Sequence, residues 1–147
     1  MSVLQQAVVG FSWGTAVELS KKENRARLSP AAIKGLLGIA KHWKLRDDDT
    51  RALLGGISSG SFYGLKGRAG KTLKTLDEDQ LTRISLLIGI FKALNILYSR
   101  SLADAWISLA NANPMFGGDS ALNYIKMGGI PALVRVRQLL DARRGGR

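Results

Sequence analysis

The sequence contains no cysteine among its 147 residues, and His42 is its only histidine. Without cysteine, the chain can form neither a disulfide framework nor a thiolate metal site or nucleophile. A lone histidine also leaves no Ser-His-acid constellation to assemble, and its place near the end of an expected helix favours a structural role there. These shortages predict a binding or regulatory protein rather than an enzyme, with no metal site and no cofactor.

Alternating β-branched runs of convincing length are missing as well, which predicts an all-α fold. The N-terminal run from Val3 to Leu19 mixes apolar residues with glutamine, serine and threonine, and it carries no basic residue before its apolar part. It is therefore a poor signal peptide and too polar for a membrane span. Together with the absence of cysteine, this pattern predicts a cytoplasmic protein with no membrane partner.

Negative charge is scarce: 22 Lys and Arg stand against 11 Asp and Glu, a net charge of +11. Residues 1–75 hold 13 basic and 5 acidic side chains, a net of +8, whereas residues 76–147 hold 9 and 6, a net of +3. Because phosphate contacts supply most non-specific affinity for nucleic acid, this surplus predicts DNA binding by the N-terminal half. The alternative is a basic surface that serves solubility alone.

The first helical signals lie within residues 29–75. Ser29-Pro30 has the pattern of an N-cap followed by a helix-starting proline, and the apolar spacing behind it predicts a helix from about Pro30 to Trp43. Three acidic residues, Asp47 to Asp49, then precede a short apolar run that ends at Gly55-Gly56. Negative charge at a helix N-terminus explains them better than a cation site does, so a short helix is expected here.

The segment that follows the two glycines is rich in Ser, Tyr and Lys. A short helix, a tight Gly turn and a second short helix form the order of a helix-turn-helix. Hydroxyl and cationic side chains suit phosphates and base edges. The predicted DNA contacts are Ser58, Ser59, Ser61, Tyr63, Lys66, Arg68 and Lys71. A purely structural helical hairpin with a solvated basic loop is the alternative.

The C-terminal half contains the longest apolar helix signal. Asp77 and Gln80 form a capping-box pattern before a wide apolar face that runs to about Tyr98, and a similar pattern recurs from Ser101 to Asp104. A Gly-Gly break at residues 128–129 precedes Pro131, which starts a last helix. Its apolar residues Leu133, Val136 and Leu140 share one face, which leaves four arginines more exposed: Arg135, Arg137, Arg143 and Arg144.

Taken together, these pieces resemble the Xre/MbcA/ParS-type antitoxin family over about residues 29–146. The resemblance rests on the order of residues 76–94, Ala105-Trp106, Asn113-Pro-Met-Phe-Gly-Gly118, Gly128-Gly129 and Val136-Arg-Gln-Leu-Leu140. It implies an N-terminal arm (1–28), an Xre-like helix-turn-helix (29–75) and a helical toxin-binding domain with a basic tail (76–147). It also implies a homodimer that represses its own operon through operator DNA, and a RES-domain toxin, an NAD-consuming enzyme, as partner.

In this family the C-terminal region is expected to cover the toxin's active site. The residues expected to bind the toxin are Asn113, Phe116, Gly117, Met127, Gly128, Gly129, Arg135, Arg143, Arg144, Gly145 and Gly146. The sequence departs from the family at Ser58–Gly64, where Thr, Arg and Trp are usual, and at Ala121, where a proline is usual. A basic tail that touches nothing and a stand-alone helix-turn-helix regulator without a toxin remain the alternatives.

Overall fold

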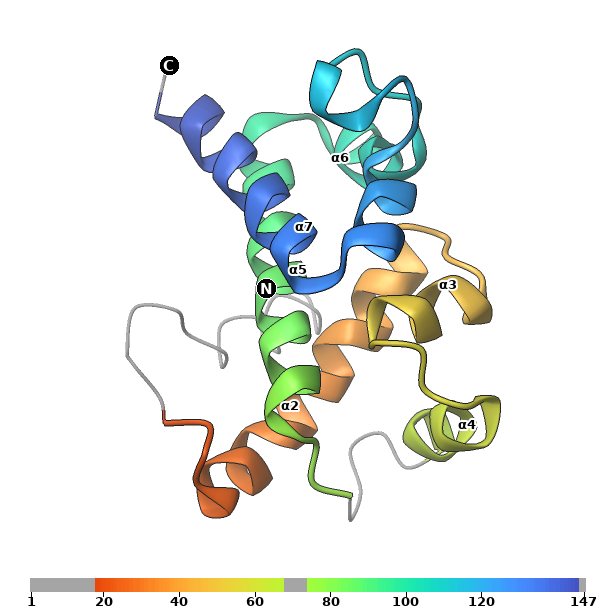
Figure 1. Ribbon diagram of the computed structural model, residues 1–147, viewed down its shortest axis with the longest axis vertical. Coiled ribbons are helices and arrows are strands. Elements are labelled where there is room, and N and C mark those ends of the chain that lie inside the picture. Colours follow the sequence, from red (N-terminus) through yellow and green to blue (C-terminus); the bar gives the residue numbers. More distant parts are fainter. Residues whose placement is uncertain (1–17, 68–73, 146–147) are drawn as a thin grey trace.

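The computed structural model describes residues 18–67 and 74–145. Within these ranges the chain is all-helical, without strands and with one isolated bridge between Ala110 and Ser120 (Figure 1). The predicted all-α class is therefore confirmed. Arg68, Lys71 and Gly146, together with residues 1–17 of the expected N-terminal arm, lie outside the described residues.

Eight helical elements follow one another in the described part of the chain. They are the α-helices α2 (Lys22–His42), α3 (Asp47–Leu53), α4 (Ser59–Gly67), α5 (Glu78–Leu97), α6 (Arg100–Ala105) and α7 (Ala121–Arg144), and the 3₁₀ helices η1 (Trp106–Ser108) and η2 (Pro114–Phe116).

Helix α5 is the spine of the fold, packing against α2 on one side and α7 on the other (Figure 1). The predicted capping box is present, because the Asp77 side chain accepts from the Gln80 amide and the Gln80 side chain accepts from the Asp77 amide. Most of α5 is buried, from Leu81 to Leu94. By length and composition α5 could span a membrane, but its burial inside the bundle marks it as a core helix.

The prediction that the first helix begins at Pro30 is wrong, since α2 begins eight residues earlier, at Lys22. Arg25 Nη1 donates to the Leu19 and Ser20 carbonyls (2.8 and 2.9 Å), which folds the preceding turn onto the first turn of α2. Ser29 is a buried linker rather than a cap: its hydroxyl donates to the Arg25 carbonyl (2.6 Å) and accepts from the Leu76 amide (2.9 Å). Pro30 removes one backbone donor, a loss that the surrounding packing tolerates. The expected boundary at residues 28–29 thus lies inside α2.

The second capping-box prediction is also wrong. Helix α6 begins at Arg100 and has no side-chain cap. Asp104 instead faces the end of α2, with Oδ2 3.3 Å from His42 Nδ1, and the His42 ring meets the Phe91 ring edge to face at 5.6 Å. His42, the last residue of α2, therefore joins α2 to α5 and α6, which confirms its structural role at a helix end. Trp106 is buried, as predicted.

Helix α7 bends at the predicted Gly-Gly break. Gly129 has φ 64° and ψ −144°, a conformation almost confined to glycine, and the helix resumes at Pro131. Beyond the bend, Leu133, Val136 and Leu140 are fully buried, confirming the predicted apolar face. The first half of α7 is thereby turned away from the second, which is held along α5 (Figure 1).

Candidate functional site

The turn that precedes α7 is built by side chains that cap backbone groups. The Asn113 side chain accepts from the Met115 amide (3.0 Å) at the start of η2, and Gly117 ends η2 in the left-handed conformation. Ser120 then caps α7 by accepting from the Asn123 amide (3.1 Å). Because Ser120 supplies the cap, α7 begins at Ala121 without a proline in its first turn.

Aromatic contacts fix this turn against the bundle. Phe116 is buried, and its ring packs edge to face on Trp106 (6.2 Å between centroids, 81°) and on Tyr124 (5.3 Å, 90°). Trp106 is itself anchored in the core next to α6. The turn is thus a rigid platform whose outer side meets the first half of α7.

An open groove of about 430 Å³ lies between the turn and α7. The lining residues come from the turn and from both sides of the bend in α7. They are Pro114, Met115, Phe116, Gly117, Asp119, Tyr124, Met127, Gly128, Pro131, Ala132 and Arg135. At its rim the Met127 side chain is 88% exposed, an unusual state for a large apolar residue. The groove therefore offers an accessible apolar surface.

Two opposite charges border this groove. Arg135 Nη1 donates to the Tyr124 hydroxyl (3.2 Å), and this hydrogen bond raises the pKa of the already strongly basic guanidinium. The Asp119 carboxylate accepts from the Ser120 amide (2.7 Å) and from the Asn123 side chain (2.9 Å), and these bonds lower the pKa of Asp119 below its ordinary value. Both groups are charged at neutral pH.

The four arginines of the last helix have different environments. Arg135 and Arg144 are exposed, as predicted. Arg137 and Arg143 are half-buried, so all four arginines are more exposed than the apolar face, as predicted, but to different degrees. Arg137 Nε donates to the Asp141 carboxylate (3.0 Å). The Arg137 guanidinium also packs on Gly89 of α5, where a Cβ would overlap it. Arg143 Nη1 donates to the Tyr98 hydroxyl (2.9 Å), which fastens the end of α7 to the end of α5.

The DNA-contact residues that fall within the described ranges gather on α4 and at its start. Phe62 and Leu65 face the core, and the other side of the helix is open to solvent. The exposed candidates are Ser58, Ser59, Ser61, Tyr63 and Lys66.

Several of these candidates already have partners within the protein. The Ser58 hydroxyl accepts from the Ser61 amide (3.1 Å) and so caps α4. Lys66 Nζ lies 3.3 Å from Asp47 Oδ1 and over the rings of Phe62 and Tyr63, at 5.5 and 5.8 Å from their centroids. Tyr63, 60% exposed, is thus the largest freely accessible side chain on α4.

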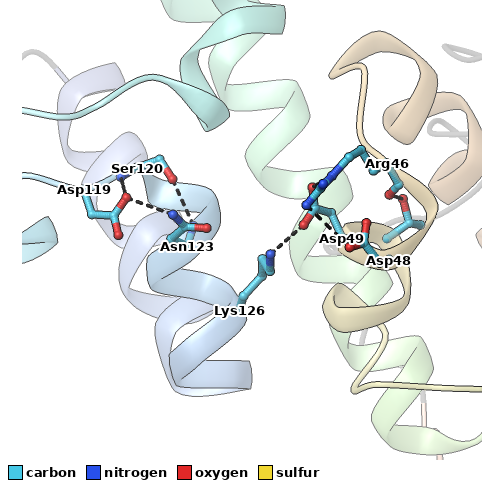
Figure 2. A network of polar contacts seen from close by, with 8 residues as sticks. Arg46, Asp48, Asp49, Asp119, Ser120, Asn123 and Lys126 are labelled. Carbon is cyan, nitrogen blue, oxygen red and sulfur yellow. Dashed lines mark hydrogen bonds and ion pairs between the residues drawn. The ribbon is translucent and has the colours of Figure 1, made fainter.

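A polar network that sequence reasoning missed connects α3 to α7. Lys126 Nζ lies 2.5 Å from Asp49 Oδ1, and Asp49 also faces Arg46 at 3.6 Å (Figure 2). Asp49 is 8% exposed, so Lys126 and Arg46 together compensate a nearly buried carboxylate, with Lys126 at the shorter distance. The three aspartates do form the first turn of α3, as predicted, but one of them also holds α7 in place.

The structure brings one group of the predicted toxin-binding residues together. Phe116, Gly117, Met127, Gly128 and Arg135 line the groove. Asn113 stands at the base of the turn and Gly129 at the bend, whereas Arg143, Arg144 and Gly145 lie at the far end of α7. Sequence reasoning missed Tyr124 and Asp119. No local spacing pairs Tyr124 with Arg135, because the two residues meet only through the bend at Gly129.

Comparisons with known proteins locate the same region. A family model described as the antitoxin Xre/MbcA/ParS C-terminal toxin-binding domain matches residues 94–146, so that it begins inside α5 and includes the whole groove. The chain is also 38% identical over 128 residues to "Uncharacterized protein y4oB" of Sinorhizobium fredii (strain NBRC 101917 / NGR234), covering 86% of this chain and 94% of that protein. No solved structure gave a significant match. The chain belongs to the Xre/MbcA/ParS antitoxin family.

Proposed function

We propose that this antitoxin neutralises an NAD-consuming RES-domain toxin by covering the toxin's active site with its C-terminal region. The observation that carries the proposal is the position of the toxin-binding family match, residues 94–146, on the turn, the groove and the whole of α7. The antitoxin acts by shape and charge, not by catalysis. We place the complex in the cytoplasm, with no membrane partner and no cofactor.

The end of α7 suits the covering role because it is both anchored and cationic. Arg143 ties it to Tyr98, and α7 remains helical to Arg144, whose side chain is exposed. An arginine fork binds carboxylates and phosphates, the groups that an NAD-binding cleft is built to accommodate. In this proposal Arg144 and the glycines at 145 and 146 contact the toxin's cleft. Arg143 keeps the end of α7 in place through its bond to Tyr98.

Co-expression with the toxin tests this proposal. Deleting residues 143–147 should restore toxicity, and Arg144→Ala should weaken neutralisation more than Tyr98→Phe, which removes only the anchor. Replacing Arg27, an exposed cation on α2, with Gln is a matched control that should leave neutralisation intact. If the truncated chain neutralises and binds the toxin as well as the full chain does, the covering mechanism is wrong.

We further propose that the α3–α4 pair is a helix-turn-helix that binds operator DNA and represses the operon, with a homodimer presenting two copies of α4 to two half-sites. Its support is the exposed outer side of α4, with Tyr63 accessible and Ser59 free of helix capping, and the net charge of +8 over residues 1–75. Arg68 and Lys71 add cations directly after α4. Lys66 contributes less than a free lysine would, because Asp47 partly neutralises it.

An electrophoretic mobility shift with the DNA upstream of the operon tests this second activity. Tyr63→Ala should weaken binding, and Arg68→Ala or Lys71→Ala should each reduce the salt dependence of the affinity by about one counterion. Unchanged, salt-dependent binding by all three variants would remove these residues from the footprint. DNA binding without any toxin encoded nearby would favour a stand-alone regulator.

A further inference from the structure

The groove between the 113–119 turn and α7 has a chemistry that specifies what it binds. We propose that it receives a segment of the toxin in which a large apolar side chain stands next to a carboxylate, with the carboxylate paired to Arg135. This inference rests on the proposed toxin-binding function and adds to it the kind of toxin segment that is recognised. The groove lies wholly within residues 94–146, which match a toxin-binding domain, and this position favours the toxin as occupant.

The apolar part of the groove is preorganised. Phe116 and Tyr124 are held at right angles to each other, and Trp106 supports Phe116 from behind. Since these rings are already ordered, an incoming side chain meets a surface that loses little conformational entropy on binding. Met127 differs, because it is almost fully exposed and unbranched, and it can fold over the occupant. A volume of about 430 Å³ has room for a large apolar side chain.

The charge at one side of the groove is uncompensated. Among the described residues, Arg135 forms no ion pair, and its single hydrogen bond goes to the Tyr124 hydroxyl. That bond fixes the guanidinium near the groove and leaves its other donors available. Arginine binds carboxylates through two parallel hydrogen bonds, so a carboxylate is the group that completes this geometry.

The charge at the turn gives the bound segment a direction. Asp119 lines the groove from the turn, ahead of α7, and its hydrogen bonds from Ser120 and Asn123 keep it ionised. A second carboxylate placed beside Asp119 would be repelled, whereas one beside Arg135 is attracted. The groove thus favours an acidic residue close to Arg135 and disfavours one close to Asp119.

The test measures the affinity of the full-length chain for the purified toxin of the same operon by titration calorimetry. Arg135→Gln should weaken binding about 10- to 100-fold, and Arg135→Lys, which keeps the charge without the fork, should recover part of that loss. Met127→Ala should weaken binding about 3- to 10-fold. A matched control, Arg27→Gln at an exposed position on α2 outside residues 94–146, should bind as the wild type does.

The outcomes separate this inference from the proposed function. If the wild type binds the toxin and the Arg135 and Met127 variants bind equally well, the groove inference is overturned and the toxin-binding function stands. If the wild type does not bind the toxin at all, both fall. If these substitutions instead change self-association in sedimentation while toxin affinity is constant, the groove belongs to a second copy of this chain, which also overturns the inference.

Discussion

Helices α4 and α7 both expose side chains suited to binding, but they are held in very different ways. Helix α4 has nine residues, three of them glycine, and only Phe62 and Leu65 are buried. Helix α7 has 24 residues and fastens itself to α5 through an apolar stripe, to α3 through Lys126 and to Tyr98 through Arg143. The proposed toxin surface is thus rigidly supported, whereas the proposed DNA surface depends on two side chains.

One chain thus combines a firmly packed binding surface with a helix that has little tertiary support. A helix of nine residues is marginal in water without tertiary support. Helix α4 is therefore expected to open locally at a lower free energy than α7, whose opening requires disruption of the central packing. DNA contact would then order α4 further, whereas the toxin would meet a surface that is already formed.

Truncating one core leucine in each helix should give the largest contrast. Leu133→Ala removes a fully buried side chain between α7 and α5 and should lower the free energy of unfolding by ~2–5 kcal/mol. Leu65→Ala removes a similar side chain from α4, and it should cost less because α4 can detach without unfolding the bundle. Urea denaturation followed by circular dichroism measures both. Equal losses would mean that α4 is as firmly integrated as α7.

Two glycine substitutions should have opposite signs. Gly129→Ala places a Cβ at the positive φ of the α7 bend and should destabilise the protein by ~1–3 kcal/mol. Gly60→Ala adds a methyl group to α4 where nothing lies within 4 Å, and it should stabilise by ~0.5–1 kcal/mol by favouring the helix. Thermal unfolding measures the stability change of each variant. Stabilisation by Gly129→Ala would show that the bend is not required.

The two lysine–aspartate pairs should differ as well. Among the described residues, Lys126→Gln leaves the nearly buried Asp49 with Arg46 as its one cationic partner, and it should cost ~1–2 kcal/mol. Lys66→Gln breaks the exposed pair with Asp47 and should cost about 0.5 kcal/mol or less. Chemical denaturation at low and high salt compares them, since salt screens the exposed pair more strongly. If Lys66→Gln lost more stability than Lys126→Gln, the Lys126–Asp49 pair would not be the stronger of the two.

The smallest expected effect is the pH dependence contributed by Asp119. Its pKa in the folded chain is lowered below the ordinary 3.8, first by the Ser120 backbone amide and then by the Asn123 side chain. A lowered pKa stabilises the fold above pH 3.8, and this contribution disappears as pH falls through the folded value. Asp119→Asn should therefore be slightly less stable than the wild type at pH 6, with the difference shrinking as the pH falls below 3.8. A constant difference across this range would exclude the carboxylate charge as its cause.

Much of this fold could be predicted because its signals are local. The Asp77–Gln80 capping box, the acidic start of α3 and the Gly-Gly bend each follow from a few neighbouring residues. The start of α2 could not be predicted in the same way. Ser29-Pro30 carries the local pattern of a helix start, yet burial of Leu28 and the bond from the Leu76 amide favour a longer helix. Tertiary contacts overrode the local preference there.

Part of the groove lining could be predicted from the sequence, and part could not. The order of residues 113–129 marked the region, but Tyr124 and Asp119 join the groove only through the way α7 bends over the turn. The sequence likewise separates Lys126 from Asp49 by 77 positions, and no periodicity connects them. The sequence predicts that Arg143 is an exposed cation, but its hydrogen bond to the Tyr98 hydroxyl holds it against the end of α5.

Hydrogen exchange of the full-length antitoxin with and without its toxin distinguishes the two surfaces. We expect toxin-dependent protection in the turn at 113–119 and along α7, with α4 unchanged and exchanging faster than α7 in the free chain. Protection confined to α3 and α4, with the turn and α7 unaffected, would contradict this expectation.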